Sequence, residues 1–294
     1  MAQNEPLGRN QPVMTYMDHL GSAVLFGGYA NQERLNDTWI WNGIWTQVNG
    51  LVSPSPRSGH SMTYDTHKEL LYMFGGRGKD GLLNDTWTFD GENWKEIKTQ
   101  NVPTARQSHR ITYNPIEKQI YLFGGSGNDR NSLSDTWTFD GQNWTEVKSD
   151  VKGRMQHTMV FDPNLKGLLV FGGFSRKDGK KQLPSETLIM KDSQWHVLDI
   201  DGPAPRDHHA AVYDPHREAS LIFGGYNSDY LNDTWQFKNS QWTQLDNQGP
   251  FRAGKPAIFK VDAKKIVMFG GASPEKFGLT DFWVFADKWA KWDR

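Results

Sequence analysis

The sequence predicts an all-β fold, a propeller of six blades, and three observations support this prediction. First, the tripeptide Phe-Gly-Gly recurs at intervals of 46 to 52 residues, beginning at Phe26, Phe74, Phe123, Phe171, Phe223 and Phe269. Second, every repeat contains several short runs of apolar, aromatic and β-branched residues, which favour strands. Third, no apolar pattern of helical period occurs between these runs. A repeat of roughly 50 residues with a double glycine after an apolar run is typical of a propeller blade.

The second repeat shows the expected order of elements. It begins with a strand and a polar turn, continues with an apolar strand that ends at a double glycine, and closes with two strands joined by an Asp-Gly hairpin turn. The corresponding segments are 61–64, 65–69, 70–74, Gly75-Gly76, 83–89, Asp90-Gly91 and 94–97. Successive strands joined by short turns are expected to be antiparallel neighbours, which gives four strands per blade.

All six repeats are expected to form a single domain, 1–294, without a linker. The approximate blades are 6–50, 51–99, 100–149, 150–199, 200–246 and 247–294. Pro6 aligns with Pro54, so the first repeat begins where the others begin. Each blade should therefore come from one consecutive repeat, and the ring should close by side-chain packing between the first and last blades.

Aromatic residues are abundant and follow the repeat. The chain contains 13 Trp, 16 Phe and 9 Tyr. Most tryptophans lie in third strands or open fourth strands, as Trp87 and Trp94 do in the second repeat. We interpret them as packing between blades, because flat sheets need bulky side chains to fill the space between them.

Charge and composition limit the partners. The formal net charge of −1 offers no basic field for nucleic acid. No apolar stretch approaches the roughly 18 residues that cross a bilayer, and the N-terminus lacks a secretion pattern. We expect a soluble, cytoplasmic protein without a cofactor, although a processed secreted form stays open. Cysteine is absent, which excludes disulfides and thiol catalysis.

The double glycines, the element Asn-Asp-Thr-Trp and a downstream Trp together resemble the kelch-repeat family over residues 6–294. The resemblance implies a propeller whose loops between second and third strands, together with the loops between blades, form the ligand face. It does not specify an activity, because kelch propellers include interaction adaptors, a sialic-acid mutarotase, plant specifier proteins and the oxidase domain of galactose oxidase. The oxidase chemistry needs a cysteine that this chain lacks. The iron motif of the specifier proteins, Glu-x-x-x-Asp-x-x-x-His, is incomplete after Glu33 and after Glu146.

An arginine precedes the first strand of every repeat, and an acid occurs once in every repeat. The arginines are Arg9, Arg57, Arg106, Arg154, Arg206 and Arg252, and the acids are Asp37, Asp85, Asp135, Glu186, Asp233 and Asp281. The arginines could form a cationic ring that binds a carboxylate or phosphate. The equal numbers favour internal ion pairs, because an unpaired buried charge is unfavourable.

Histidines follow four of these arginines by three residues, namely His60, His109, His157 and His209. We expect them to hydrogen-bond neighbouring backbone. We expect no metal site, because ligand nitrogens must approach one ion to about 2.1 Å, whereas equivalent residues on separate blades are spread around a channel.

Specificity must depend on residues that break the repeat. The fourth repeat has the longest loop after its double glycine, 174–182, with four cations that either form a solvated loop or collect an anionic partner. Asp207 and His208 are the best candidates for proton transfer, although neighbours on an extended strand point to opposite sides. The candidate catalytic residues are His208, Asp207 and Glu275. The candidate ligand-binding residues are Arg77, Arg154, Arg176, Arg206, Tyr29, Phe174, Tyr226 and Tyr230.

Two functions remain. The first is a recognition module that binds a protein partner or an acidic small ligand across the loop face and channel mouth. The alternative is a non-redox, cofactor-independent enzyme of the isomerase, mutarotase or lyase type. Its substrate would be a small carboxylate bound by one of the candidate arginines.

Overall fold

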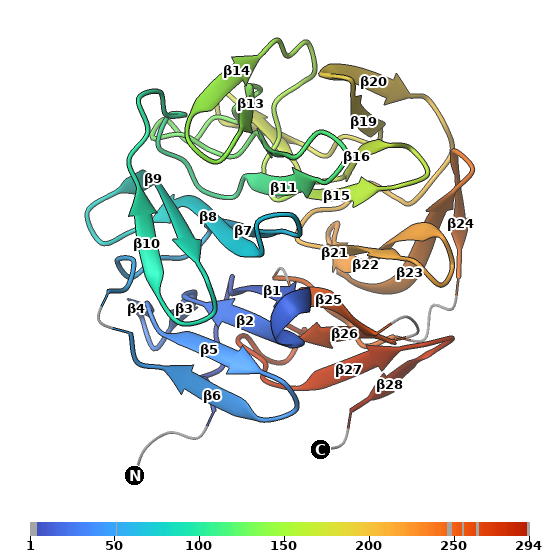
Figure 1. The fold of residues 1–294 in the computed structure, drawn as a ribbon. Helices are drawn as coiled ribbons and strands as arrows, with labels where there is room; N and C mark the ends of the chain where they lie inside the picture. Colours follow the sequence, from blue (N-terminus) through green and yellow to red (C-terminus); the bar gives the residue numbers. More distant parts are fainter. Residues whose placement is uncertain (1–4, 51, 246–248, 255, 263–264, 293–294) are drawn as a thin grey trace.

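The structure, a computed structural model, describes residues 5–50, 52–245, 249–254, 256–262 and 265–292. Six four-stranded antiparallel sheets surround a central channel, which confirms the predicted propeller (Figure 1). Within the described residues, none of the helical structure could cross a membrane, being too short and too polar.

Each blade consists of four strands that are consecutive in the chain apart from two small hairpin insertions. Blades one and two contain β1 (Val13–Met17), β2 (Ser22–Phe26), β5 (Thr38–Trp41) and β6 (Trp45–Val48), then β7 (Ser61–Asp65), β8 (Leu70–Arg77), β9 (Leu82–Phe89) and β10 (Trp94–Ile97). Blades three and four contain β11 (Arg110–Asn114), β12 (Gln119–Phe123), β13 (Thr136–Phe139) and β14 (Trp144–Val147), then β15 (Thr158–Asp162), β16 (Gly167–Phe171), β19 (Thr187–Lys191) and β20 (Gln194–Leu198). Blades five and six contain β21 (Ala210–Asp214), β22 (Ala219–Tyr226), β23 (Tyr230–Lys238) and β24 (Gln241–Gln244), then β25 (Ala257–Asp262), β26 (Lys265–Phe269), β27 (Phe282–Phe285) and β28 (Trp289–Lys291).

Three small elements lie outside the sheets. They are the hairpin of β3 (Tyr29–Ala30) and β4 (Glu33–Arg34), the hairpin of β17 (Ser175–Lys177) and β18 (Lys180–Gln182), and the 3-10 turn η1 (Asp18–Leu20).

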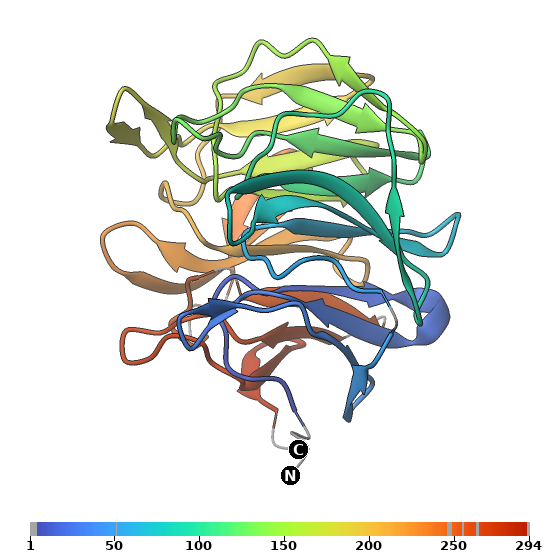
Figure 2. The ribbon, with the colours of Figure 1, turned by 90° about the vertical axis from the view of Figure 1, so that its left-hand side faces the viewer.

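The propeller has two different faces, which the side view separates (Figure 2). One side carries the connections from second to third strands, such as residues 78–81, and the connections between blades; we call it the loop face. The β17–β18 hairpin projects from this side. The opposite side carries the tight turns after first and third strands, such as 66–69 and 90–93, together with η1; we call it the turn face.

The second strand of each blade is buried on both sides. It packs against both neighbouring blades, and we call each interface between two blades a seam. In β2, Ala23 and Leu25 pack against blade six, whereas Val24 and Phe26 pack against blade two. Alternate residues of a strand point to opposite faces, so one apolar run contributes to two interfaces. The core is therefore a ring of six inter-blade clusters.

A hydrogen bond from a fourth-strand tryptophan to a threonine of the preceding blade recurs at the seams. Between blades one and two, Trp94 Nε1 donates to Thr38 Oγ1 at 2.9 Å. The same bond joins Trp144 to Thr86, Trp195 to Thr136, Trp242 to Thr187, and Trp289 to Thr234. The tryptophans thus pack between blades, as predicted, and also fix the register of the seam.

The seam that closes the ring differs. Phe282 occupies the position that Thr38 has in blade one, and it stacks on Trp41 with a centroid distance of 4.6 Å. Phe282 also contacts Trp45 and Phe269. Ring closure therefore rests on aromatic packing between blades one and six, without an exchanged strand.

The double glycine joins neighbouring blades at the loop face. Gly75 and Gly76 have φ values of 60° and 105°, which side chains with a Cβ resist. A Cβ on Gly76 would lie 2.9 Å from the Cβ of His60, and the Gly76 amide donates to the carbonyl of Arg106 in the next blade. The glycines are thus required by backbone conformation and by close approach.

Candidate binding surface on the loop face

Beneath the loop face, each blade arginine pairs with the acid of its own blade. In blade two, Arg57 donates to both Asp85 oxygens at 2.6 and 2.7 Å and to the Gly75 carbonyl at 3.1 Å. Trp87 Nε1 also donates to Asp85 at 2.7 Å. Burial alone would raise the pKa of Asp85, but the bonds and charge of Arg57 outweigh it and lower the pKa.

The same pairing occurs in the other five blades. The pairs are Arg9 with Asp37, Arg106 with Asp135, Arg154 with Glu186, Arg206 with Asp233, and Arg252 with Asp281. The internal ion pairs expected from the equal numbers are present in every blade. Arg154 and Arg206, which we had placed among the ligand-binding candidates, are both buried in these pairs. We therefore leave them out of the surface described below.

The four histidines pack edge-on against aromatic rings. His60 lies against Phe26 of the preceding blade, with ring centroids 5.5 Å apart and planes at 78°. His109, His157 and His209 repeat this contact with Phe74, Phe123 and Phe171. The side chain of His209 also meets Thr158 Oγ1 at 2.8 Å. In the described part of the chain, no three metal-binding side chains gather.

Left-handed residues surround the axis at the loop face. Ser108, Gln156 and His208 have φ values near 60°, and the equivalent Gly59 has 67°. Their backbones bond from blade to blade: the Ser108 amide donates to Gly59, Gln156 to Ser108 and His208 to Gln156, at 2.7 to 3.3 Å. We call these four residues the inner ring. It lies at the loop-face end of the first strands of blades two to five.

A shallow pocket of about 580 Å³ lies over blades two to four on the outer side of the inner ring. Arg77, Arg130 and Arg176 line it, together with Phe174 and Asp80. Arg77 and Arg130 are exposed and Arg176 is half-buried. These three guanidinium groups come from the segments that follow the double glycines of three different blades.

Cations flank Phe174 at the edge of this pocket. The Arg176 guanidinium lies 5.4 Å and the Lys181 ammonium 4.5 Å from the ring centroid. Lys181 also forms a 2.7 Å ion pair with Asp207 of blade five. The long loop of the fourth repeat is therefore a hairpin packed against the pocket rather than a loop free in solvent.

Asp207 and His208 contact each other directly, with His208 Nδ1 2.6 Å from Asp207 Oδ1. Neighbours on an extended strand point to opposite sides, but the left-handed φ of 57° at His208 turns its side chain back toward Asp207. Burial would raise the pKa of Asp207, but His208 and Lys181 lower it. The Asp207 carboxylate is thus held between the His208 ring and the Lys181 ammonium. Glu275 is exposed in the blade-six loop, and the described residues give it no contact with this pair.

Aromatic side chains occupy the remaining part of the loop face. Tyr226 and Tyr230 of blade five contact each other with centroids 5.6 Å apart. Phe251 and Phe277, from the segment entering blade six and from its loop, are 51% and 71% exposed. Sequence reasoning missed both phenylalanines, because they lie in segments whose aligned positions carry no repeated aromatic. In blade one, the guanidinium carbon of Arg34 lies 5.8 Å from the ring centroid of Tyr29.

Comparison with known proteins gave one family and two related proteins. The KLHDC2/KLHL20/DRC7 Kelch-repeats domain matches residues 1–154, 89–255 and 156–294. Dynein regulatory complex subunit 7 of Chlamydomonas reinhardtii is 39% identical over an alignment of 111 residues, which covers 35% of this chain and 10% of that protein. The flagellar outer-arm dynein alpha chain of the same organism is 32% identical over an alignment of 138 residues, which covers 42% of this chain and 3% of that protein. The similarity thus spans only a small part of each relative.

Proposed function

Because the chain belongs to the kelch-repeat family, we propose that it is a protein-recognition module. Its loop face binds a partner segment that carries acidic side chains beside apolar ones. The observation that carries this proposal is the group of Arg77, Arg130 and Arg176 around one pocket, outside the internal ion pairs.

The charge of the loop face supports an acidic partner. The loops after the double glycines of blades two to four contain seven cations, Arg77, Lys79, Arg130, Arg176, Lys177, Lys180 and Lys181, and three acids, Asp80, Asp129 and Asp178. This local excess of four positive charges stands against a net charge of −1 for the whole chain. Guanidinium groups bind carboxylates through paired hydrogen bonds, so a partner rich in glutamate or aspartate fits this surface.

The aromatic part of the face supports an apolar neighbour to that acidic segment. Phe251 and Phe277 expose more than half of their surface, and Tyr226 and Tyr230 lie in the adjacent blade. Exposed aromatic residues next to arginines are typical of protein interfaces. The names of the two relatives denote parts of dynein assemblies. By this similarity we propose a partner within such an assembly and a cytoplasmic or flagellar setting.

The proposal is tested with a fluorescein-labelled peptide of glutamates followed by leucines. Replacing Arg77, Arg130 and Arg176 together by serine should weaken its binding at least about tenfold, because several charge-assisted bonds are lost. Replacing Phe251 and Phe277 by serine should weaken binding of this peptide but not of one in which serines replace the leucines. Fluorescence anisotropy measures both.

A matched control separates site binding from general attraction. Lys95, Lys288 and Lys291 are exposed and lie away from the loop face, on outer strands and on the turn face. Their triple serine variant removes the same charge and should bind like the natural chain. Equal weakening in both triple variants would contradict the proposed surface. A photo-crosslinker at position 130, compared with one at position 95, would then identify the natural partner.

The enzyme alternative rests on the contact between Asp207 and His208. It would gain support if a small carboxylate were turned over by the natural chain and not by a His208→Ala variant that still binds the acidic peptide. Peptide binding with no turnover leaves the recognition module as the function.

A further inference from the structure

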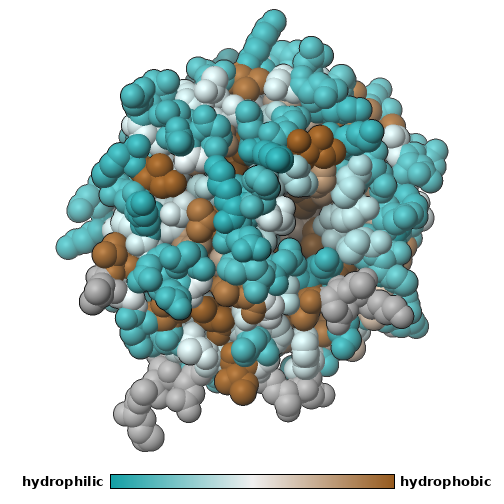
Figure 3. All heavy atoms as spheres, in the orientation of Figure 1, coloured by the Kyte–Doolittle hydropathy of each residue, from teal (hydrophilic) through white to brown (hydrophobic). Residues whose placement is uncertain are grey.

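A second cavity, separate from the loop-face pocket, fills the centre of the propeller. It has a volume of about 600 Å³ and is lined by the first strands of all six blades. The turn face is hollowed near its centre (Figure 3), and the inner ring of blades two to five lies at the other end. The central channel and the loop-face pocket share no lining residue. The channel is therefore a cavity separate from the proposed partner surface, and it opens on the turn face.

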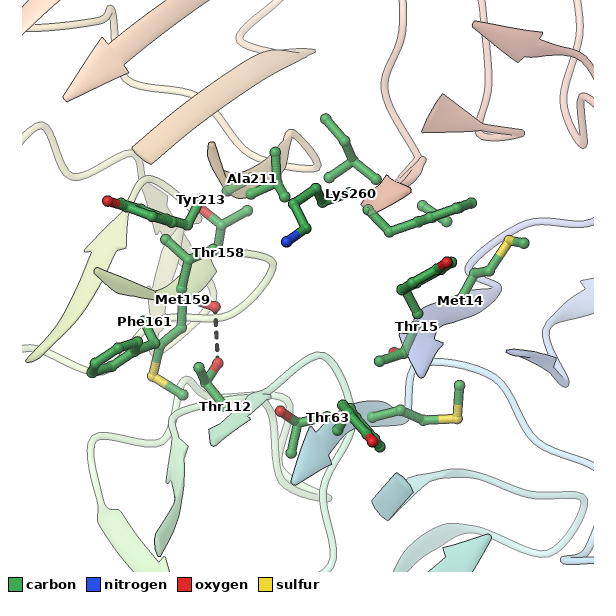
Figure 4. A pocket seen from close by; sticks show the side chains of 18 of the residues that line it. Met14, Thr15, Thr63, Thr112, Thr158, Met159, Phe161, Ala211, Tyr213 and Lys260 are labelled. Atoms are coloured by element: carbon green, nitrogen blue, oxygen red, sulfur yellow. Dashed lines mark hydrogen bonds between the residues drawn. The ribbon is translucent and has the colours of Figure 1, made fainter. Parts of the chain in front are cut away.

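Most of the channel wall is apolar. The residues that line it include Met14, Met159 and Phe161, with the methyl-bearing Thr15 and Thr63 (Figure 4). The polar atoms of these strands are largely used between blades. Thr112 Oγ1, for example, donates to the Met159 carbonyl at 2.9 Å, and the Tyr113 amide donates to Thr63 Oγ1 at 2.9 Å. The wall can thus hold an apolar body without leaving these groups unpaired.

Arg110 breaks this pattern at the inner end of the channel. It begins β11, where the other blades have Val13, Ser61, Thr158, Ala210 and Ala257. Its Nε donates to the His157 carbonyl at 3.0 Å. It forms no ion pair with any described residue, in contrast to the six blade arginines. Arg110 is half-buried and is one of the residues that line the channel.

The pKa values agree with an Arg110 side chain that forms no ion pair with an acid among the described residues. Burial lowers the pKa of Arg110 to about 10, and no carboxylate offsets that shift. The same guanidinium helps to lower the pKa of the buried His209, after the larger effects of burial and of Arg206. The charged side chains that line the channel besides Arg110 are Lys260 and Asp18, toward the turn face. The inner end of the channel thus carries a positive charge.

We propose that the central channel binds a small monocarboxylate with an apolar body. Its carboxylate pairs with the Arg110 guanidinium, and its body lies along the methionine, threonine and aromatic side chains toward the turn face. A guanidinium presents two parallel N–H donors that match a carboxylate. Concave, mostly apolar cavities with few polar groups are the usual form of small-ligand sites. This site is independent of the loop-face proposal.

Octanoate is the probe, and isothermal titration calorimetry measures its binding to the natural chain. The Arg110→Ser variant takes the residue that blade two has at this position and should bind at least about tenfold more weakly, because a charge-assisted pair is lost. Arg110→Lys keeps the charge but not the paired donors and should show an intermediate loss. Lys260→Met should change binding less than twofold. Octanol, which lacks the carboxylate, should bind the natural chain about as weakly as octanoate binds the Arg110→Ser variant.

Nuclear Overhauser contacts from octanoate to the channel methionine and threonine methyl groups locate the ligand. If no binding is detected at about 10 mM octanoate, the binding free energy is weaker than roughly −3 kcal/mol. That result would overturn the proposal. The proposal would also be overturned if the Lys260→Met variant lost its affinity for octanoate while both Arg110 variants kept theirs. If Arg110→Ser fails to fold, the octanol comparison and the methyl contacts in the natural chain still decide the question.

Discussion

Replacing Phe282 by threonine should destabilise the propeller, although blades one to five all have threonine at the equivalent position. In those blades the threonine accepts a hydrogen bond from the next tryptophan, as Thr38 does from Trp94. At the closing seam Phe282 is only 3% exposed and stacks on Trp41. The variant would gain a bond to Trp45 and lose the aromatic packing.

The magnitude follows from these two contributions. Removing a buried phenylalanine ring costs about 3–5 kcal/mol, including the cavity that is left. A new hydrogen bond returns about 1 kcal/mol. The free energy of unfolding should therefore fall by about 2–4 kcal/mol. A conservative Phe282→Leu variant keeps most of the apolar volume and should lose about 1.5 kcal/mol or less.

Urea denaturation followed by tryptophan fluorescence measures these differences. In the Phe282→Thr background, a further Trp45→Phe change tests whether the new hydroxyl bonds to the indole. A Phe282→Thr variant as stable as the natural chain would show that the closing seam does not depend on aromatic packing, and would refute this reasoning.

Three further predictions concern the repeated contacts. Thr86→Val leaves the Trp144 indole N–H without its acceptor and should cost about 1–3 kcal/mol in urea denaturation, whereas Thr86→Ser keeps the hydroxyl and should cost less. The lowered pKa of Asp85 means that its ion pair stabilises the fold above the unfolded pKa of about 3.9 and loses this contribution as the pH falls through the folded value. The urea concentration at the unfolding midpoint should therefore decrease as the pH is lowered below about 4. The Asp85→Asn variant should be destabilised by about 3 kcal/mol at neutral pH, and its stability should depend less on acid pH. Identical dependence on pH in the variant and the natural chain would contradict the pairing. Gly76→Ala should cost at least about 2 kcal/mol by thermal denaturation, because its φ of 105° and the nearby His60 Cβ leave no room for a side chain.

The periodic part of the fold could be predicted because each requirement repeats six times. A double glycine is needed wherever the second strand meets the next blade, and it appears there in all six repeats. The pairing of Arg154 with Glu186 could also be predicted, although blade four lacks the usual element. One acid per repeat was sufficient evidence, because a buried arginine needs a partner.

The candidate binding residues were predicted only in part. Arg77, Arg176 and Phe174 follow double glycines, so the sequence places them on the loop face, and the structure gathers them around one pocket. The sequence left open whether Asp207 and His208 touch, since their contact depends on a left-handed residue that the strand pattern does not reveal. Phe251 and Phe277 were missed because exposure is a property of the assembled blades.

The sequence by itself determined the number of blades, the order of strands and the partner of each blade arginine, because these depend on local spacing and on charge balance within one repeat. The tertiary structure decided which residues from different repeats share a cavity. Arg110 illustrates the difference: in the sequence it is one residue at the start of a strand, and only the closed ring of six blades encloses it without an acid. The same closure brings Phe282 against Trp41 from the other end of the chain. Such contacts between distant segments are fixed by the ring geometry, which no single repeat contains.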